Sequence, residues 1–338
     1  MRDRDAAHAA LGELNATLYD EAGDRAAVRE ALARAFAPDA TVHLCHPFGT
    51  VSGPDGFDDA ALAPLAEAMP DVERRQFIAI AGEVEGQTWV GHCGQYCGTF
   101  ERPFLDIPPT GRLAQFRYHE FFRIENDRVI EMQAIWDLPA LMMQANAWPM
   151  VPSLGVELMA PAPATGDGML PGGDPEDDAA AVKLVLDMLA GLQRHKEEGA
   201  EAMGLERFWH PKFNWYGPTG IGAMRGIGGF RRDHQIPFLQ TLPDRRGAGE
   251  TLVFFAEGSY VGTTGWPNME MSVTGGGWLG IAPTGAEITM RSLDFWRIEN
   301  GLLRENWVLV DLLHVWNQLG VDVFERMRAL TFNRQASP

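Results

Sequence analysis

Apolar positions in the first half of the chain follow a helical period and then a strand period. Residues 6–36 place leucine, valine and phenylalanine at helical spacing with a break near Gly23, which predicts one helix and a shorter second one. The pattern then predicts a strand at 40–45, a helix at 53–69, strands at 71–83, 86–100, 112–125 and 129–137, and a closing helix at 138–146. Asn126-Asp127 is typical of a two-residue hairpin turn between the last two strands.

The second half repeats this order after a segment of different composition. Residues 148–175 contain six prolines and five glycines, which favours an interdomain linker over a helix or a strand ladder. The pattern after it predicts helices at 176–199 and 200–209, a strand at 213–216 and a helix at 226–240. We therefore expect domain 1 at 1–147, a linker at 148–175 and domain 2 at 176–338.

Residues 107–144 and 281–318 are two copies of one sequence. At a constant offset of 174, 14 of the 38 aligned positions are identical. Pro38, Gly53 and Pro70-Asp71 align with Pro211, Gly226 and Pro243-Asp244 at an offset of 173, and Gly94-Gln-Tyr96 aligns with Gly258-Ser-Tyr260 at an offset of 164. A repeat of this length is a whole domain. Its element order predicts an α+β unit in which helices pack on one curved antiparallel sheet.

The composition is that of a soluble chain that forms a core, with 46% hydrophobic and 22% charged residues among 338. A net charge of −18 disfavours nucleic acid and anionic membranes as partners, and solubility is its simplest interpretation. No apolar run resembles a signal peptide or a membrane span. Three cysteines, all in the first half, do not make a disulfide framework, so we expect reduced thiols and a cytoplasmic location.

The repeated motifs carry a family resemblance. Gly-x-Tyr-x-Gly, Ile-Pro-Pro-Thr-Gly and Phe-x-Arg-Ile-Glu-Asn-Asp, followed by Glu and then Asp-Leu, resemble the SnoaL-like polyketide cyclases of the nuclear-transport-factor-2-like superfamily. The resemblance implies two tandem α+β cones, each around an apolar pocket, and an aldol ring closure by a His–Asp pair without a cofactor. The histidine position corresponds to Glu120 and Asp294, and the aspartate position to Ala134 and Val308. The proton-transfer aspartate of the family is therefore replaced in both copies.

Each copy retains one carboxylate on the expected pocket wall, Glu120 in the first and Asp294 in the second. Burial among apolar groups would raise the pKa of such a carboxylate and suit it to general acid–base catalysis. The structural alternative is a carboxylate paired with an arginine or bonded to the backbone. Strand alternation adds candidates for substrate contact, namely Tyr118 and Trp136 in the first copy and Ser292, Trp296 and Asn306 in the second.

Two tyrosines and a histidine complete the catalytic candidates. Tyr96 and Tyr260 stand where many family members have a histidine, so a phenol there would donate a hydrogen bond to the substrate or, alternatively, be a satisfied core group. His234, on the predicted covering helix, would form a pair with Asp294 or lie on the surface. Trp215 and Tyr216 are neighbours on a strand, so one of the two faces the pocket mouth.

Histidines and cysteines of the first half also suggest a metal site. The types suit zinc or iron, but the spacing contains no paired ligand motif, so we expect packed histidines and buried thiols rather than a metal. The residues are His43, Cys45, His46, His92, Cys93 and Cys97. His43 and His46 remain candidate bases at the pocket rim.

Three functional hypotheses follow. The first is a cofactor-free enzyme of the cyclase, isomerase, dehydratase or hydrolase type, acting on a small, apolar, oxygenated substrate. The second is a binding protein that kept the pocket and lost the proton-transfer groups, as the Ala134 and Val308 replacements favour. The third is a metal-dependent enzyme in the first domain. We expect the two copies to form an intramolecular pseudo-dimer, with a homodimer as the alternative assembly.

Overall fold

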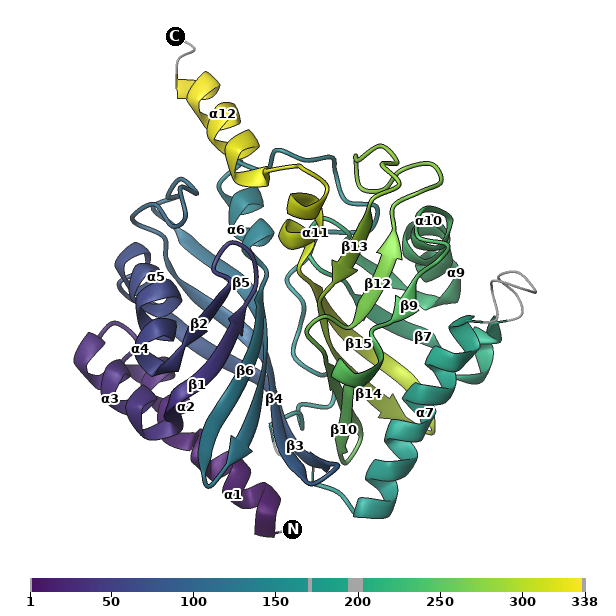
Figure 1. Cartoon of the computed structure of the whole chain (residues 1–338), viewed down its shortest axis with the longest axis horizontal. Helices are drawn as coiled ribbons and strands as arrows, with labels where there is room; N and C mark the ends of the chain where they lie inside the picture. The colour runs from purple at the N-terminus through teal and green to yellow at the C-terminus, as the bar shows by residue number, and fades with distance from the viewer. Residues whose placement is uncertain (1, 170–171, 194–202, 336–338) are drawn as a thin grey trace. The chain divides into compact units, whose positions relative to one another are not determined.

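A computed structural model describes residues 2–169, 172–193 and 203–335. Their contacts group into two compact units (Figure 1): unit 1 comprises residues 1–150 and 311–338, and unit 2 comprises residues 151–310. These units are defined by contacts between residues, whereas the expected domains were defined by the extent of the sequence repeat. The expected domain boundaries at 147 and 175 therefore stay predictions.

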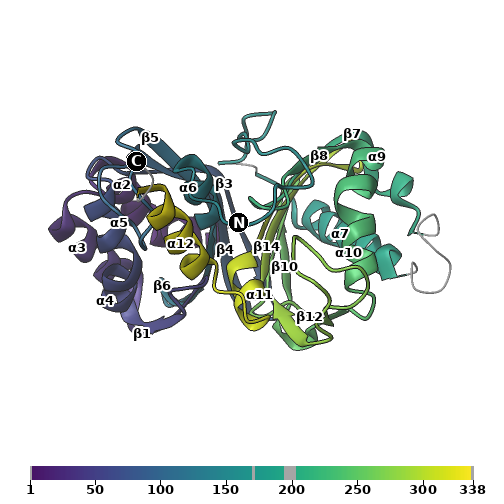
Figure 2. The ribbon, with the colours of Figure 1, turned by 90° about the horizontal axis from the view of Figure 1, so that it is seen from above.

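Unit 1 is built on one six-stranded sheet with the order β2-β1-β6-β5-β4-β3. Its strands are β1 (Phe36–Leu44), β2 (Thr50–Ser52), β3 (Glu73–Val84), β4 (Gln87–Thr99), β5 (Leu113–Glu125) and β6 (Arg128–Trp136). Its helices are α1 (Arg2–Ala10), α2 (Gly12–Asp20), α3 (Arg25–Ala35), α4 (Gly53–Phe57), the π-helical segment η1 (Asp58–Leu62), α5 (Ala63–Ala68), α6 (Leu138–Gln144), α11 (Leu312–Gln318) and α12 (Val323–Gln335). Figure 2 shows α2 to α5 on one face of this sheet, which we call the inner face.

Local chemistry explains several of these elements. The Asp24 carboxylate accepts hydrogen bonds from the backbone N–H groups of Ala26 and Ala27, which caps α3. Asn126 and Asp127 have φ angles of 50° and 59°, as a hairpin turn with two left-handed residues requires, so the predicted turn is confirmed. A Cβ at Gly94 would lie 2.5 Å from the hydroxyl oxygen of Tyr118, so glycine is required where this ring crosses β4.

Unit 2 has a six-stranded sheet of the order β10-β11-β14-β15-β7-β8 and a three-stranded sheet of the order β13-β12-β9. The strands are β7 (Trp209–Tyr216), β8 (Ala223–Arg225), β9 (Arg246–Gly247), β10 (Val253–Glu257), β11 (Tyr260–Thr264), β12 (Met269–Ser272), β13 (Glu287–Met290), β14 (Ser292–Glu299) and β15 (Leu302–Val310). The helical segments are α7 (Pro175–Gln193), η3 (Leu205–Arg207), α9 (Gly226–Phe230), the π-helical η4 (Arg231–Gln235), α10 (Ile236–Thr241) and η5 (Gly249–Thr251). Figure 2 shows α7, α9 and α10 on one face, the inner face of this unit.

Part of the expected linker is fixed to the outer face of the unit 2 sheet. Val156 forms a β-bridge with Ala223, and the carbonyl oxygen of Pro161 accepts a hydrogen bond of 2.9 Å from the indole N–H of Trp307. The backbone N–H of Ala164 donates to the Glu305 carboxylate at 3.2 Å. We call residues 155–167 the strap.

The strand registers correct one alignment of the repeat. In unit 1, Tyr96 pairs with Phe116, whereas Tyr260 pairs with Arg297, which is the counterpart of Arg123 at the offset of 174. His92 pairs with Glu120 just as Thr263 pairs with Asp294, so the structural offset on this strand is 171. The alignment at an offset of 164 is therefore wrong by seven residues. An odd slip moves every side chain to the other face of the sheet.

The α+β class with two repeated sheet-and-helix units is confirmed. Most predicted elements lie within a few residues of their expected bounds, although β7 begins at Trp209 rather than at residue 213. The helix expected at 176–199 ends as α7 at Gln193, and its remainder lies outside the described residues. Of the helix expected at 200–209, the described part contains the short η3, and β7 already begins at Trp209. None of the described helices is long and apolar enough to cross a membrane.

Candidate functional site

Glu120 lies on the inner face of unit 1, fully enclosed and ion-paired. Its carboxylate accepts hydrogen bonds from the Arg74 guanidinium at 2.5 and 3.2 Å and from the Trp136 indole N–H at 3.0 Å. The Tyr96 hydroxyl donates to it at 3.4 Å. Glu120 and Arg74 are each 2% exposed. Both carboxylate oxygens are thus held by protein donors.

Aromatic rings close around this ion pair. The Arg74 guanidinium lies 4.3 Å from the centroid of the Tyr118 ring, and the Tyr96 ring lies 5.1 Å from Tyr118 and 4.9 Å from Trp136. All four side chains are almost fully buried. Arg74 also donates to the Asn15 side chain at 3.0 Å, which ties the pair to α2. The predicted wall residues do surround Glu120, but they fill the space beside it.

Electrostatics hold this cluster in one protonation state. Burial is the largest single effect and opposes the charge of Arg74, but Glu120, Tyr118 and Tyr96 together outweigh it and raise the pKa of the guanidinium. Burial, and then the Glu120 charge, raise the pKa of the Tyr96 phenol well above its usual range. His92 lies 3.3 Å from Arg74, and burial followed by the Arg74 charge lowers the pKa of its imidazole. Such a network is a poor proton relay because each partner stabilises the present state of the others.

Among the other candidates of the first half, two histidines have partners outside the Glu120 cluster. His43 pairs with Gln133, so it faces the outer side of the sheet, and its ring nitrogen bonds to the Thr50 hydroxyl at 2.9 Å. His46 follows β1, and its ring lies 6.1 Å from that of Phe324. The three cysteines are buried, and none of them forms a disulfide within the described part of the chain. Among the described residues, no three His, Cys, Asp or Glu side chains are grouped as a metal site would require.

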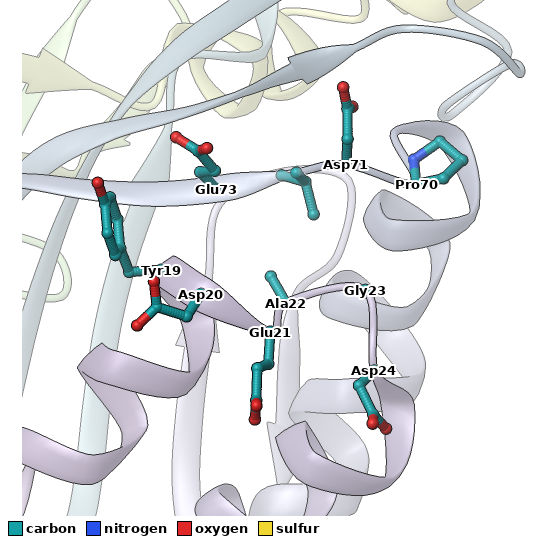
Figure 3. Close-up of a pocket in the computed structure, with 10 residues that line it drawn as sticks. Tyr19, Asp20, Glu21, Ala22, Gly23, Asp24, Pro70, Asp71 and Glu73 are labelled. Carbon is teal, nitrogen blue, oxygen red and sulfur yellow. The ribbon is translucent and has the colours of Figure 1, made fainter.

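A surface groove of about 560 Å³ in unit 1 is a separate feature (Figure 3). It is lined by Tyr19, Asp20, Glu21, Ala22, Gly23, Asp24, Pro70, Asp71, Val72 and Glu73. Several of its carboxylates have structural partners. Asp71 accepts from the backbone and hydroxyl of Thr99 at 2.6 and 2.7 Å, Asp24 caps α3, and Glu73 pairs with Arg75. These carboxylates therefore have structural roles, and the groove lies where two loops meet.

Asp294 occupies the position of Glu120 on the inner face of unit 2, with different neighbours. Its cross-strand partners are Val308 and Thr263. Ser292 and Val310 pair with each other just as Tyr118 and Trp136 do in unit 1. The two large aromatic rings of Tyr118 and Trp136 are thus replaced by the smaller side chains of Ser292 and Val310. The Ser292 hydroxyl donates to the Asp294 carboxylate at 2.6 Å, and Asp294 is partly exposed.

Trp215, Asn306 and Trp296 form a row across three strands of the same inner face, as their pairing shows. The amide of Asn306 is buried and donates to the Phe295 carbonyl oxygen at 2.9 Å, so it is in structural use. Trp215 settles the alternative left open by the sequence: it faces the covering helices, and Tyr216 faces outward. The Tyr216 hydroxyl contacts the buried Glu305 carboxylate at 3.3 Å.

His234 lies on η4 and stacks on Trp215. The ring centroids are 4.3 Å apart and the planes differ by 21°. Phe230 and Phe238 each lie 5.3 Å away. Burial, and then the positive charge of Arg245, lower the pKa of His234 to about 3, so its imidazole is neutral near pH 7. The pairing of His234 with Asp294 stays a prediction.

Several enclosed polar atoms of unit 2 have no hydrogen-bond partner within the described part of the chain. They include His234 Nδ1, Gln235 Oε1, Asn268 Oδ1, Trp209 Nε1 and Trp296 Nε1. Asn268 is joined to the site because its amide donates to the backbone oxygen of Ser292 at 3.0 Å. Buried polar groups are nearly always bonded, so each of these atoms marks a point where a small molecule or water would complete the bonding.

Tyr260 is placed on the outer face, against the expectation of a catalytic phenol beside Asp294. It pairs with Arg297, and its hydroxyl donates to the strap residue Asp167 at 2.5 Å. The physical reason is the odd register slip described above. Tyr96, by contrast, shares the inner face with Glu120.

Three residues that matter were not singled out from the sequence: Arg74, Gln235 and Asn268. Arg74 reaches Glu120 through the β3–β4 register, which sequence spacing does not reveal. Gln235 ends the π-helical segment η4, and Asn268 lies in the loop between β11 and β12. The one available signal was Arg74-Arg75 on a strand, where alternation sends one of the two arginines inward.

Comparison with known proteins agrees with the fold. A sequence model described as SnoaL-like polyketide cyclase matches residues 13–145 and 190–319, together well over half of the chain. Among solved structures, the chain is similar to IdmH from Streptomyces antibioticus (20% identity, TM-score 0.35, 41% of this chain and 98% of that chain). It is also similar to AclR from Streptomyces galilaeus (19%, 0.36, 44% and 86%). A search of curated proteins found no match. On the extent of the family match, this chain belongs to the SnoaL-like polyketide cyclase family.

Proposed function

We propose that unit 2 carries a cofactor-independent acid–base site for a small, largely apolar, oxygenated compound, and that unit 1 is its structural companion. The main support is that the side chains beside the carboxylate differ between the two units. Where Tyr118 and Trp136 close over Glu120, Ser292 and Val310 stand beside Asp294. The Glu120 carboxylate is saturated by protein donors, whereas the Asp294 side of the repeat retains exposure and enclosed polar atoms without partners.

The chemistry follows from the groups present. Asp294 acts as the general base that removes a proton from a carbon next to a carbonyl group, and the Ser292 hydroxyl orients the carboxylate. The indole N–H of Trp296, two residues along the same face, donates to the oxygen on which negative charge develops. Isomerisation, cyclisation and dehydration all begin with this proton transfer, so the reaction belongs to that group.

A non-catalytic binding protein is the second candidate, because Val308 stands at the position of the family's proton-transfer aspartate. The two candidates differ in what Asp294 does. In the enzyme it moves a proton, whereas in the binding protein it contributes a polar contact at most.

An untargeted screen of oxygenated metabolites, followed by mass spectrometry for new products, tests the proposal. For a converted compound, we expect Asp294→Asn to lower kcat by about a hundredfold or more, as loss of a general base does. The matched control is Glu270→Gln, an exposed carboxylate of the same unit that pairs with Arg246. Full turnover by Asp294→Asn would contradict the assignment, and binding without any product would favour the second candidate.

A further inference from the structure

Both units contain a π-helical segment at the same place in the repeat. Asp58–Leu62 and Arg231–Gln235 are related by the offset of 173. Single π-helical turns are uncommon and occur often at functional sites, because the extra residue redirects side chains. In unit 1 the turn directs Ala61 and Leu62 into the core, where they are 0% and 3% exposed. In unit 2 the same two positions are His234 and Gln235.

This exchange places polar groups where the other copy has apolar ones. Gln235 is 4% exposed, and its Oε1 atom has no partner among the described residues. His234 is partly exposed as a residue, but its Nδ1 atom is enclosed and likewise has no partner there. Trp215, Phe230 and Phe238 surround the imidazole, so the polar edge borders a flat aromatic surface.

The two atoms favour one kind of ligand group. An amide oxygen only accepts hydrogen bonds, and the Nδ1 atom of a neutral imidazole accepts when its proton is on Nε2. A hydroxyl group has a proton for one of them and remains uncharged. A carboxylate would place negative charge against the Gln235 oxygen, and a methyl ether has no proton to donate.

We infer that His234 and Gln235 form a subsite that recognises an uncharged hydroxyl group on a flat, apolar ligand. The inference rests on the proposed function, because it assumes that the ligand binds on the inner face of unit 2. It assigns the π-helical turn the role of choosing among ligands, while Asp294 performs the chemistry.

Isothermal titration with 2-naphthol, 2-methoxynaphthalene and 2-naphthoate tests the inference on the full chain. These probes share one flat body and differ in the polar group. We expect the wild type to bind 2-naphthol about tenfold more tightly than either of the others. The variant His234→Ala/Gln235→Leu installs the residues of unit 1, and we expect its preference for the hydroxyl to disappear while the ether still binds.

A second variant distinguishes failure of the inferred hydroxyl subsite from failure of the proposed site in unit 2. Ser292→Tyr restores the unit 1 ring beside the carboxylate, and we expect it to block all three probes. If it blocks binding but His234→Ala/Gln235→Leu keeps the tenfold preference, the inference is wrong and the site stands. Equal affinity of the wild type for 2-naphthol and its ether would show that these atoms hold water only, which also overturns the inference. If Ser292→Tyr changes nothing, or no probe binds the wild type, the proposed site itself is wrong.

Discussion

Glu120 and Asp294 illustrate how neighbours, rather than residue type, decide what a carboxylate does. Both stand on the inner face at equivalent register positions. Arg74, Trp136 and Tyr96 hold Glu120 in a closed ion pair, whereas the small Ser292 hydroxyl donates a hydrogen bond to Asp294. Alternation along the strands predicted the wall residues of both copies from the sequence. It did not predict Arg74, because the partner of a buried charge comes from a strand whose register is set by the whole fold.

The buried His234 predicts how the stability of the fold depends on pH. Its folded pKa of about 3 lies below the usual value of 6.5, so below about pH 6.5 the unfolded chain binds a proton that the folded chain does not. Stability is therefore lost as the pH falls from about 6.5 toward about 3, by at most about 1.4 kcal/mol per pH unit for this group. His234→Phe keeps a ring against Trp215 and removes the titration. We expect urea unfolding between about pH 7 and about pH 5 to show a shallower loss of stability in this variant. An unchanged slope would contradict the buried, neutral imidazole.

At the scale of elements, strand β11 shows where sequence comparison fails. Gly94-Gln-Tyr96 and Gly258-Ser-Tyr260 match in spacing, yet Tyr96 faces inward and Tyr260 outward. The single strand β4 of unit 1 corresponds to β11 and β12 in unit 2, which belong to different sheets. The two alignments differ by an odd number of residues, so they place each side chain on opposite faces of the sheet. Only the cross-strand hydrogen bonds distinguish them, and these depend on residues far apart in the sequence.

The strap gives Tyr260 a structural role that can be tested. The Tyr260 hydroxyl donates to Asp167, and the Trp307 indole and the Glu305 carboxylate bind the same segment. Tyr260→Phe removes one charge-assisted hydrogen bond, and we expect it to lower the free energy of unfolding by about 1.5–3 kcal/mol. Because Tyr260 lies on the outer face, the affinity of the Tyr260→Phe variant for 2-naphthol should equal that of the wild type. Weaker binding with unchanged stability would instead return Tyr260 to the ligand site.

For the whole molecule, duplication allows the two copies to divide tasks. A lone domain of this kind must keep a pocket for its ligand and a core for its stability within one sheet. Here unit 1 fills its inner face with large aromatic rings and an ion pair, and unit 2 has the smaller Ser292 and Val310 at the positions of Tyr118 and Trp136. The sequence repeat predicted the fold of both units, because identities at glycine, turn and core positions preserve backbone geometry. The repeat did not predict the different roles of the two units, because these depend on the volume of the side chains beside one carboxylate.

This division predicts that the ion pair of unit 1 is replaceable without loss of ligand binding. Glu120→Leu leaves Arg74 buried without its partner, and breaking such a pair costs about 3–5 kcal/mol. Adding Arg74→Met removes the isolated charge, so we expect the double variant to recover most of this loss, because apolar groups of similar volume commonly substitute for a buried pair. Urea unfolding measures the stability, and titration with 2-naphthol measures the site. Wild-type affinity in the double variant supports separate tasks, whereas loss of affinity with recovered stability would show that unit 1 takes part in binding.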